Sequence, residues 1–272
     1  MRKPIVWLAL SIAVSSHVVA EPVVRGFYLD QNLGGAVNPL GVQLGTKLLY
    51  RTPLIRQKGI LWESTKIDVG IANSLSPAYD FIGGFLDIEP IAVFDVAFTA
   101  QFAGYYSGLG YGFHDLAGYG AAFDQNTLAS LGSKNTAGYL LCAAPTLKFA
   151  LGSFAFSNTL HVNYFNVDGG SGYFYETYAN CILAKSGVEL YNDAYALMSI
   201  GAGFMAGLND SVLVVPASGY QSHTLQAVGI LSKALSGRLS VYAALTAGMY
   251  LEDRYYQYQP RVAGLAGFTS RL

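Results

Sequence analysis

The chain has 272 residues, of which 52% are apolar and only 12% charged, with a formal net charge of −1 at pH 7. Soluble domains carry about 25% charged residues, so an ordinary soluble domain is disfavoured, and the lack of a basic excess argues against a nucleic-acid partner. An α-helical membrane protein needs apolar runs of about 20 residues, and none occurs after the first twenty positions.

The first twenty residues have the pattern of an export signal. Arg2 and Lys3 form a basic start, residues 5–14 are mostly apolar, and Val18-Val19-Ala20 provides small residues before a cleavage point. An apolar stretch of about ten residues is too short to span a bilayer. We predict a cleaved signal peptide over residues 1–20 and one domain over residues 21–272, with an uncleaved anchor as the alternative.

Residues 139–164 have the pattern of a β-hairpin with two chemically different faces. Gly152-Ser153 fits a two-residue turn with glycine first, which pairs Leu151 with Phe154. This register predicts a small or polar face made of the pairs Lys148–Ser157, Thr146–Thr159, Ala144–His161 and Cys142–Asn163. It predicts an apolar face made of Phe149–Phe156, Pro145–Leu160, Ala143–Val162 and Leu141–Tyr164, interrupted by Asn158.

The same alternation continues along the chain and predicts twelve strands. Their expected ranges are 23–30, 40–51, 60–72, 79–88, 92–104, 138–151, 154–166, 174–190, 194–207, 222–235, 238–250 and 261–272. Alternating strands in a chain with few charges and many aromatic and glycine residues are typical of a transmembrane β-barrel. The predicted fold is therefore all-β: a transmembrane antiparallel up-and-down barrel of about 12 strands.

The connections are expected to alternate in length. Tight turns are predicted at residues 89–91, 152–153, 191–193 and 236–237, with a longer link at 52–59. Long loops are predicted at 73–78, 105–137, 167–173, 208–221 and 251–260. Short turns at one rim and long loops at the other are typical of outer-membrane barrels, in which the short turns are periplasmic and the long loops extracellular.

The other turns sort residues in the same way as the first hairpin. The turn at 89–91 pairs Asp87 with Val93, and the turn at 191–193 pairs Lys185 with Ser199 and Glu189 with Tyr195. The turn at 236–237 pairs Lys233 with Ser240 and Val228 with Leu245. In each hairpin one face is apolar and must contact lipid, so the mixed face is expected to line the lumen.

The predicted lumen-lining residues are mostly charged or polar. They are Lys47, Arg51, Lys66, Asp68, Asp87, Asp95, Thr99, Gln101, Lys148, Thr159, His161, Asn163, Lys185, Glu189 and Lys233. Buried charges are costly unless they are paired or hydrated. Two interpretations stay open: ion pairs that brace a nearly closed interior, and a solute path whose selectivity the charges adjust. The later strands also place Leu183, Leu197, Leu225, Leu231 and Leu265 on the predicted inner face, which favours a partly filled interior or an amphipathic ligand.

At the level of class, the chain resembles bacterial outer-membrane β-barrel proteins over the whole of residues 21–272. Tyrosines gather near the predicted long-loop rim, as in an interfacial girdle; they are Tyr105, Tyr106, Tyr139, Tyr164, Tyr173, Tyr175, Tyr250, Tyr255, Tyr256 and Tyr258. Residues 261–272 resemble the C-terminal strand by which such proteins are recognised for assembly, although Leu272 replaces the more usual aromatic end. The resemblance implies location in the bacterial outer membrane, contact with its lipids, and recognition by a barrel-assembly machinery.

Few residues suggest catalysis or metal binding. One predicted strand contains His161 together with Ser157, Thr159 and Asn163. Outer-membrane phospholipases use a Ser, His and Asn set, so this composition invites comparison. Residues i and i+4 of one strand lie about 13 Å apart, however, so Ser157 cannot form a hydrogen bond with His161. Cys142 and Cys181 are expected two strands apart, about 10 Å, beyond the reach of a disulfide at about 7 Å. We expect free thiols, with a bridge as the alternative if the eighth strand is irregular. No metal site or cofactor is expected.

Residues 105–137 form the longest predicted loop, which contains aromatic residues such as Phe113 and Phe123 and few charges. A loop of this length is commonly functional, and it could cap the barrel or fold into its mouth. The preferred function is a narrow channel or transporter for small or amphipathic solutes. The alternatives are a structural or surface-interaction barrel that acts through its extracellular loops, and a lipid-modifying outer-membrane enzyme using His161.

Overall fold

A computed structural model describes residues 23–272, except residues 39, 56, 58, 109–111 and 170–171. The long strands are β1 (Gly26–Val37), β2 (Gly41–Pro53), β3 (Lys66–Leu75), β4 (Tyr79–Ile91), β5 (Phe94–Tyr105), β7 (Thr136–Leu151), β8 (Phe154–Val167), β11 (Ser186–Gly201), β12 (Phe204–Val215), β13 (Tyr220–Ala234), β14 (Leu239–Glu252) and β15 (Pro260–Arg271). The short elements are β6 (His114–Leu116), α1 (Gln125–Leu131), β9 (Tyr173–Glu176) and β10 (Cys181–Ala184).

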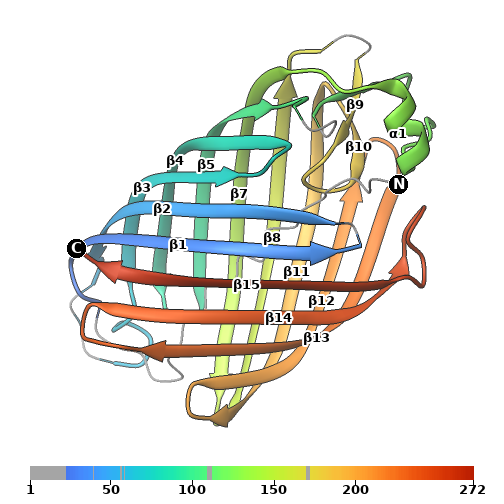
Figure 1. Cartoon of the computed structure of the whole chain (residues 1–272). Coiled ribbons are helices and arrows are strands. Elements are labelled where there is room, and N and C mark those ends of the chain that lie inside the picture. Colours follow the sequence, from blue (N-terminus) through green and yellow to red (C-terminus); the bar gives the residue numbers. More distant parts are fainter. Residues whose placement is uncertain (1–22, 39, 56, 58, 109–111, 170–171) are drawn as a thin grey trace.

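The long strands form a closed antiparallel barrel (Figure 1) in the order β1-β15-β14-β13-β12-β11-β8-β7-β5-β4-β3-β2. The last strand pairs with the first, from Tyr28–Arg271 to Val37–Val262. The twelve-strand prediction is confirmed. The first strand is longer than expected, because it continues through the glycine-rich segment to Val37. The predicted signal peptide lies outside the described residues.

The β7–β8 hairpin has the predicted register. Leu151 pairs with Phe154, Lys148 with Ser157, and the pairing runs on to Gly138–Val167. Gly152 has a φ of +61°, a left-handed conformation that glycine adopts at no steric cost. Glycine at the first position of this turn therefore sets the register, as the sequence predicts.

The prediction for residues 174–221 is wrong. Residues 191–193 lie in the middle of β11 and do not form a turn, and the expected loop 208–221 contains most of β12. The turn instead consists of Ala202 and Gly203, with φ values of +52° and +77°. Two positive φ values define the twist that suits a tight hairpin. Alanine is uncommon in that conformation, whereas Asn192-Asp193 has the composition of a turn. The sequence pattern therefore placed the turn at residues 191–193 and not at residues 202–203.

The register between β13 and β14 is displaced by one residue from the prediction, and this reverses the faces of β13. Val228 pairs with Thr246, and Lys233 pairs with Val241. Val228 and Ile230 are therefore buried on the inner face, while Leu225 and Leu231 are exposed on the outer face. Lys233 also lies on the outer face, so its assignment to the lumen is wrong. Leu197 and Leu265 do pack in an inner apolar cluster.

The observed pairing of β4 with β5 differs from the predicted register by an even number of residues, so each residue keeps its predicted face. Leu86 pairs with Phe98 and Asp87 with Ala97, because the turn lies at residues 92–93. Asp87, Asp95, Thr99 and Gln101 still share the inner face.

The difference in loop length between the two rims rests mainly on two connections at the long-loop rim, residues 106–135 and 168–185. The other connections at the long-loop rim span three to seven residues.

The outer wall of the barrel is apolar. Its exposed large side chains include Leu33, Ile71, Phe98, Phe102, Leu147, Phe149, Val162, Leu208 and Leu245. A closed sheet leaves no strand edge unpaired, and an apolar outer wall requires a hydrocarbon solvent. These two features define a transmembrane β-barrel and confirm the predicted fold class. Among the described residues, no helix combines the length and the apolar character needed to cross a membrane.

The predicted tyrosine girdle is only partly correct. Tyr106, Tyr139 and Tyr258 are exposed, whereas the side chains of Tyr105, Tyr175, Tyr250 and Tyr256 are buried. The buried rings face the inside of the barrel, where they meet the short elements. β6, β9 and β10 form a separate three-stranded sheet, and α1 begins after Asp124, whose carboxylate accepts hydrogen bonds from the backbone N–H groups of Asn126 and Thr127. These four elements, which we call the cover, lie at the end of the barrel opposite the C-terminus (Figure 1).

Replacing Val162 by arginine should impair assembly more than the same change at Thr99. Val162 faces outward on β8, where an arginine near the bilayer midplane costs about 2–4 kcal/mol, whereas Thr99 faces inward opposite Cys142. The measurement is the folded fraction of Val162→Arg and Thr99→Arg in lipid vesicles, read by heat-modifiable gel migration. Equal damage from both changes would contradict the assigned faces.

Candidate functional site

Charged side chains pair along the inner wall of β2–β5 and β7, nearer the short-turn rim. Arg51 and Asp68 lie directly opposite each other on β2 and β3. The guanidinium donates from Nε to Oδ1 at 2.8 Å and from Nη2 to Oδ2 at 2.7 Å. A two-point contact of this kind is stronger and more directional than a single ion pair. It fixes the relative height of the two strands.

Glu89 is the centre of the next group. Its Oε2 atom lies 3.3 Å from Lys66 Nζ and 2.9 Å from Lys148 Nζ, and Lys148 also contacts Asp95 at 2.8 Å. Glu89 is almost completely buried, so its charge depends on these two ammonium groups for compensation. The pairing supports the interpretation that lumen charges brace the wall. Glu89 was not predicted as a lumen residue, because it was assigned to the turn.

Asp87 is the exception in this group. It lies directly opposite Asp68 across β3 and β4, and its buried Oδ1 atom has no hydrogen-bond partner. Like charges at directly opposite positions destabilise a sheet. Asp87 is therefore a lumen residue, as predicted, but one whose Oδ1 atom the wall leaves without a hydrogen bond.

The other predicted residues of this wall also face inward. Lys47 lies over the ring of Phe85 with Nζ 5.6 Å from its centroid, and Gln101 donates to the carbonyl of Phe81 at 3.3 Å. Thr159 and Thr146 share a hydrogen bond of 2.9 Å. The assignment of Lys185 to the lumen is wrong. Lys185 is exposed between β10 and β11, because residues 181–184 belong to the cover and not to a barrel strand.

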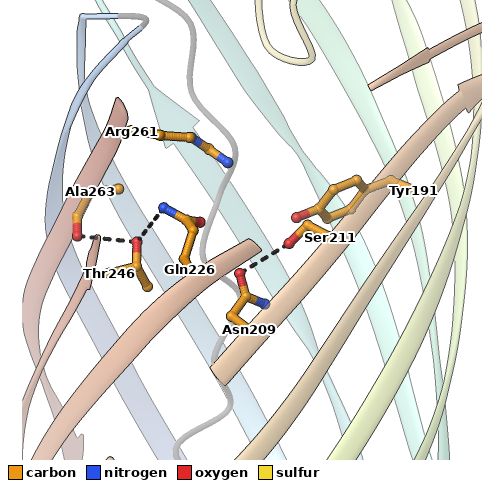
Figure 2. A pocket seen from close by; sticks show the side chains of 7 residues that line it. All are labelled: Tyr191, Asn209, Ser211, Gln226, Thr246, Arg261 and Ala263. Atoms are coloured by element: carbon orange, nitrogen blue, oxygen red, sulfur yellow. Dashed lines mark hydrogen bonds between the residues drawn. The ribbon is translucent and has the colours of Figure 1, made fainter. Parts of the chain in front are cut away.

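A polar cluster lines the opposite wall, on β11–β15 (Figure 2). Asp193 accepts hydrogen bonds from Asn209 at 2.6 Å and from Ser211 at 2.7 Å. Nearby, Gln226 donates to Thr246 at 3.1 Å, and the buried Nε of Arg261 has no partner. Beside Asp193 lies a small cavity of about 10 Å³, room for roughly one water, which is lined by Tyr191, Asn209, Ser211, Gln226, Thr246, Arg261 and Ala263. The sequence prediction missed this cluster, although the alternation of Glu189, Tyr191, Asp193 and Tyr195 could have revealed it.

The described contacts of His161 do not form a Ser-His-acid triad with Asp193 and Ser211. His161 faces inward with its ring 5.7 Å from that of Tyr191. Asp193 lies on β11 between His161 on β8 and Ser211 on β12, so the histidine and the serine are two strands, or about 10 Å, apart. A triad needs the histidine between the serine and the acid. The described contacts therefore do not support the lipid-modifying alternative.

The cover closes the long-loop mouth by apolar packing. Phe113 and Phe174 stack with centroids 5.3 Å apart, and each also contacts Tyr105 of the barrel wall edge-on. One buried cluster unites cover residues such as Phe174 and Leu183 with wall residues such as Tyr79 and Phe165. Residues 105–137 were expected either to cap the barrel or to fold into its mouth, and they contribute to the cover together with β9 and β10. Cys142 and Cys181 are free thiols, as predicted.

Two carboxyl groups are buried where the cover meets the wall. Glu176 of β9 accepts a hydrogen bond from the Tyr105 hydroxyl at 3.2 Å and from the Ala179 backbone N–H at 2.5 Å. Glu189 of β11 accepts one from Asn163 at 2.8 Å and contacts Cys181 Sγ at 3.7 Å. Glu189 and Asn163 were predicted as lumen residues, and the structure pairs them. Glu176 was missed because its segment was taken for a barrel strand.

Metal binding has no support in the part of the chain that the structure describes. No group of three or more His, Cys, Asp or Glu side chains there is arranged to hold an ion.

The geometry thus defines a transmembrane β-barrel with an ion-paired lumen and a covered mouth. No family model and no curated protein matches the sequence. Solved structures similar in fold are bacterial outer-membrane barrels. The β domain of the Bordetella autotransporter BrkA is 12% identical, with a TM-score of 0.47 over 92% of this chain and 100% of that one. The translocator domain of NalP from Neisseria meningitidis is 11% identical, with a TM-score of 0.44 over 91% and 88%. The CymD monoaromatic hydrocarbon channel is 12% identical, with a TM-score of 0.38 over 92% and 89%.

Replacing Glu89 by glutamine should destabilise the barrel, because Lys66 and Lys148 then lose their shared counter-charge. The expected loss in the free energy of unfolding is about 3 kcal/mol. The matched control is Asp87→Asn on the same strand and face, which removes a repulsion with Asp68 and should leave stability unchanged or raised. Denaturant unfolding in detergent micelles, followed by circular dichroism, measures both. A similar loss in the two variants would refute the pairing scheme.

Proposed function

We propose that the protein resides in the bacterial outer membrane and works as a narrow, gated channel for small solutes, with the cover as its gate. The lumen carries both signs of charge on one wall and a polar cluster around Asp193 on the other, which suits the passage of small polar solutes. The inner apolar cluster of Tyr195, Leu197, Val228, Ile230 and Ala244 adds a surface for the apolar part of an amphipathic solute.

The burial of Glu176 between the cover and the wall is the observation that carries this proposal. The carboxyl group lies at the contact with Tyr105, beside the apolar cluster that holds the cover in place. A cover that served only as a permanent stopper would be more stable with an apolar side chain there, because burying a carboxyl group is costly unless it is fully paired. A titratable group at the contact instead makes the release of the cover depend on pH.

The titration of Glu176 gives the direction of gating. Burial raises the pKa of the Glu176 carboxyl above its ordinary value of 4.5, and the neighbouring Glu189 carboxyl raises this pKa further. The seated cover therefore prefers a protonated Glu176. As pH rises above 4.5 toward the raised value, ionisation favours the released cover, so seating weakens with increasing pH.

His114 of the cover acts in the opposite sense at lower pH. Burial lowers the pKa of its imidazole below 6.5, so protonation favours release as pH falls below that value. In the released state the imidazole is half protonated near pH 6.5 and mostly neutral above about pH 7.5. Its opposing effect above pH 6.5 is therefore about twofold at most, and the dependence that remains belongs to the carboxyl groups.

The C-terminal strand is the proposed contact with the barrel-assembly machinery. Val262 and Phe268 lie on the outer face of β15, in the pattern expected of a recognised terminal strand. The outer wall itself is the contact with membrane lipids.

Planar-bilayer recording tests the channel and its gate together. The open fraction of the wild type should rise several-fold between about pH 6.5 and about pH 8. Glu176→Gln, which keeps the size of the side chain but cannot ionise, should remain mostly closed and nearly independent of pH over this range. Deletion of residues 107–135 should give a larger, pH-independent conductance. Silence of all three proteins would refute the channel, and an unchanged pH response in Glu176→Gln would refute the gate.

A further inference from the structure

Four polar side chains interrupt the apolar outer wall on adjacent strands. Asn158 of β8 and Asn192 of β11 are joined by an amide hydrogen bond of 2.9 Å. Asp210 of β12 and His223 of β13 are joined by a contact of 2.5 Å between Oδ1 and Nε2. We call these four residues the polar patch.

The polar patch faces outward and not into the lumen. Asp210 lies directly opposite Ala194 on one side and Leu225 on the other, and the Leu225 side chain is exposed on the outer wall. Its neighbours along β12, Asn209 and Ser211, are buried on the inner face. Side chains alternate between faces along a strand, so Asp210 must point away from the barrel.

The centre of the patch lies at the depth of the hydrocarbon, and His223 lies three residues from the start of β13. Asp210 is in the middle of β12, six residues after Phe204 and five before Val215. Ala194 pairs with Asp210 on one side and with Asn158 on the other, so the two polar pairs occupy neighbouring positions of the sheet. Other outward ionisable residues of the strands, such as Asp80, Lys233 and Glu252, lie within one residue of a strand end.

Lipid tails cannot satisfy these groups. Charged substitutions on the lipid face of a barrel are destabilising at the midplane, and an unsatisfied polar group in hydrocarbon is costly. The internal pairing compensates only part of this cost, because the Asp210 side chain is still 52% exposed and the His223 side chain 32% exposed. A carboxylate has about four acceptor positions and an amide offers both donors and acceptors, so the patch has hydrogen-bonding capacity left over.

We propose that the polar patch is the centre of an interface with a second copy of this chain. Its chemistry is self-complementary: it contains an acid beside a histidine, and two amides that each donate and accept. Under a two-fold axis each residue of a patch meets other residues of the same patch, so the acid of one copy can face the histidine or an amide of its partner. A partner of one charge sign would leave half of these groups unmatched.

The surroundings of the patch suit close approach of two barrels. Ala194, Ala196, Ala206 and Ala227 lie on the outer face of the same strands. Small residues let membrane segments approach closely, which strengthens both packing and hydrogen bonds between them. The interface therefore combines a polar centre with a border in which these small residues alternate with the exposed side chains of Leu208 and Leu225.

Cross-linking in the outer membrane tests the proposal. Ala196→Cys places a thiol beside the patch, and Ile71→Cys places one on the exposed outer face of β3, on the far side of the barrel. With a bis-maleimide, Ala196→Cys should give a product of twice the chain mass, at least several-fold more abundant than with Ile71→Cys. The wild type, whose two thiols are on the lumen side, is the background control.

A second variant asks whether the polar groups themselves hold the interface. Asp210→Leu combined with His223→Leu should reduce the cross-linked fraction of Ala196→Cys several-fold, while heat-modifiable migration shows that the barrel still folds. Three outcomes would overturn the proposal: no double-mass product from Ala196→Cys, a product of another mass, or a dimer fraction that the leucine pair leaves unchanged.

Discussion

Closure of the sheet is the constraint on which the rest of this structure depends. In hydrocarbon every backbone N–H and C=O must be paired within the protein, and the pairing of β15 with β1 removes the last open edge. Once the sheet is closed, each residue on a strand faces either lipid or lumen according to its position in the alternation. The chemistry of the lumen and of the outer wall therefore follows from register. An error of one residue in a predicted register, as for β13 and β14, exchanges the two environments along a whole strand.

The sequence predicted the barrel well where local turn chemistry and alternation agree. Gly152 has the backbone conformation that its turn needs, so β7 and β8 could be paired residue by residue. The prediction failed where these two signals conflict. Asn192-Asp193 resembles a turn, but it continues a strand whose inner face runs from Glu189 to Leu197. Ala202, in the real turn, adopts a conformation that alanine seldom adopts.

The lumen was predictable as a set of residues but not as a set of contacts. Arg51, Asp68 and Lys148 could be assigned to the inner face by alternation alone, whereas their partners depend on register. Contacts of the cover were beyond reach, because they join distant parts of the chain; Tyr105 and Glu176 are 71 positions apart. Glu176 itself gives no periodic signal, since β9 has only four residues.

The two ends of the barrel are held by different forces, and this difference has a mechanical consequence. Near the short-turn rim, neighbouring wall strands are tied by ion pairs such as Arg51–Asp68, and these hold the wall together whatever the state of the mouth. At the long-loop mouth, the cover is held by aromatic packing, by the contacts of the buried carboxyl groups of Glu176 and Glu189, and by hydrogen bonds such as that from the Tyr220 hydroxyl to the Asn180 carbonyl. Loss of the cover would break no hydrogen bond between the barrel strands, because β6, β9 and β10 form a sheet of their own. The fold therefore separates a part that must persist in the membrane from a part that can move without cost to closure.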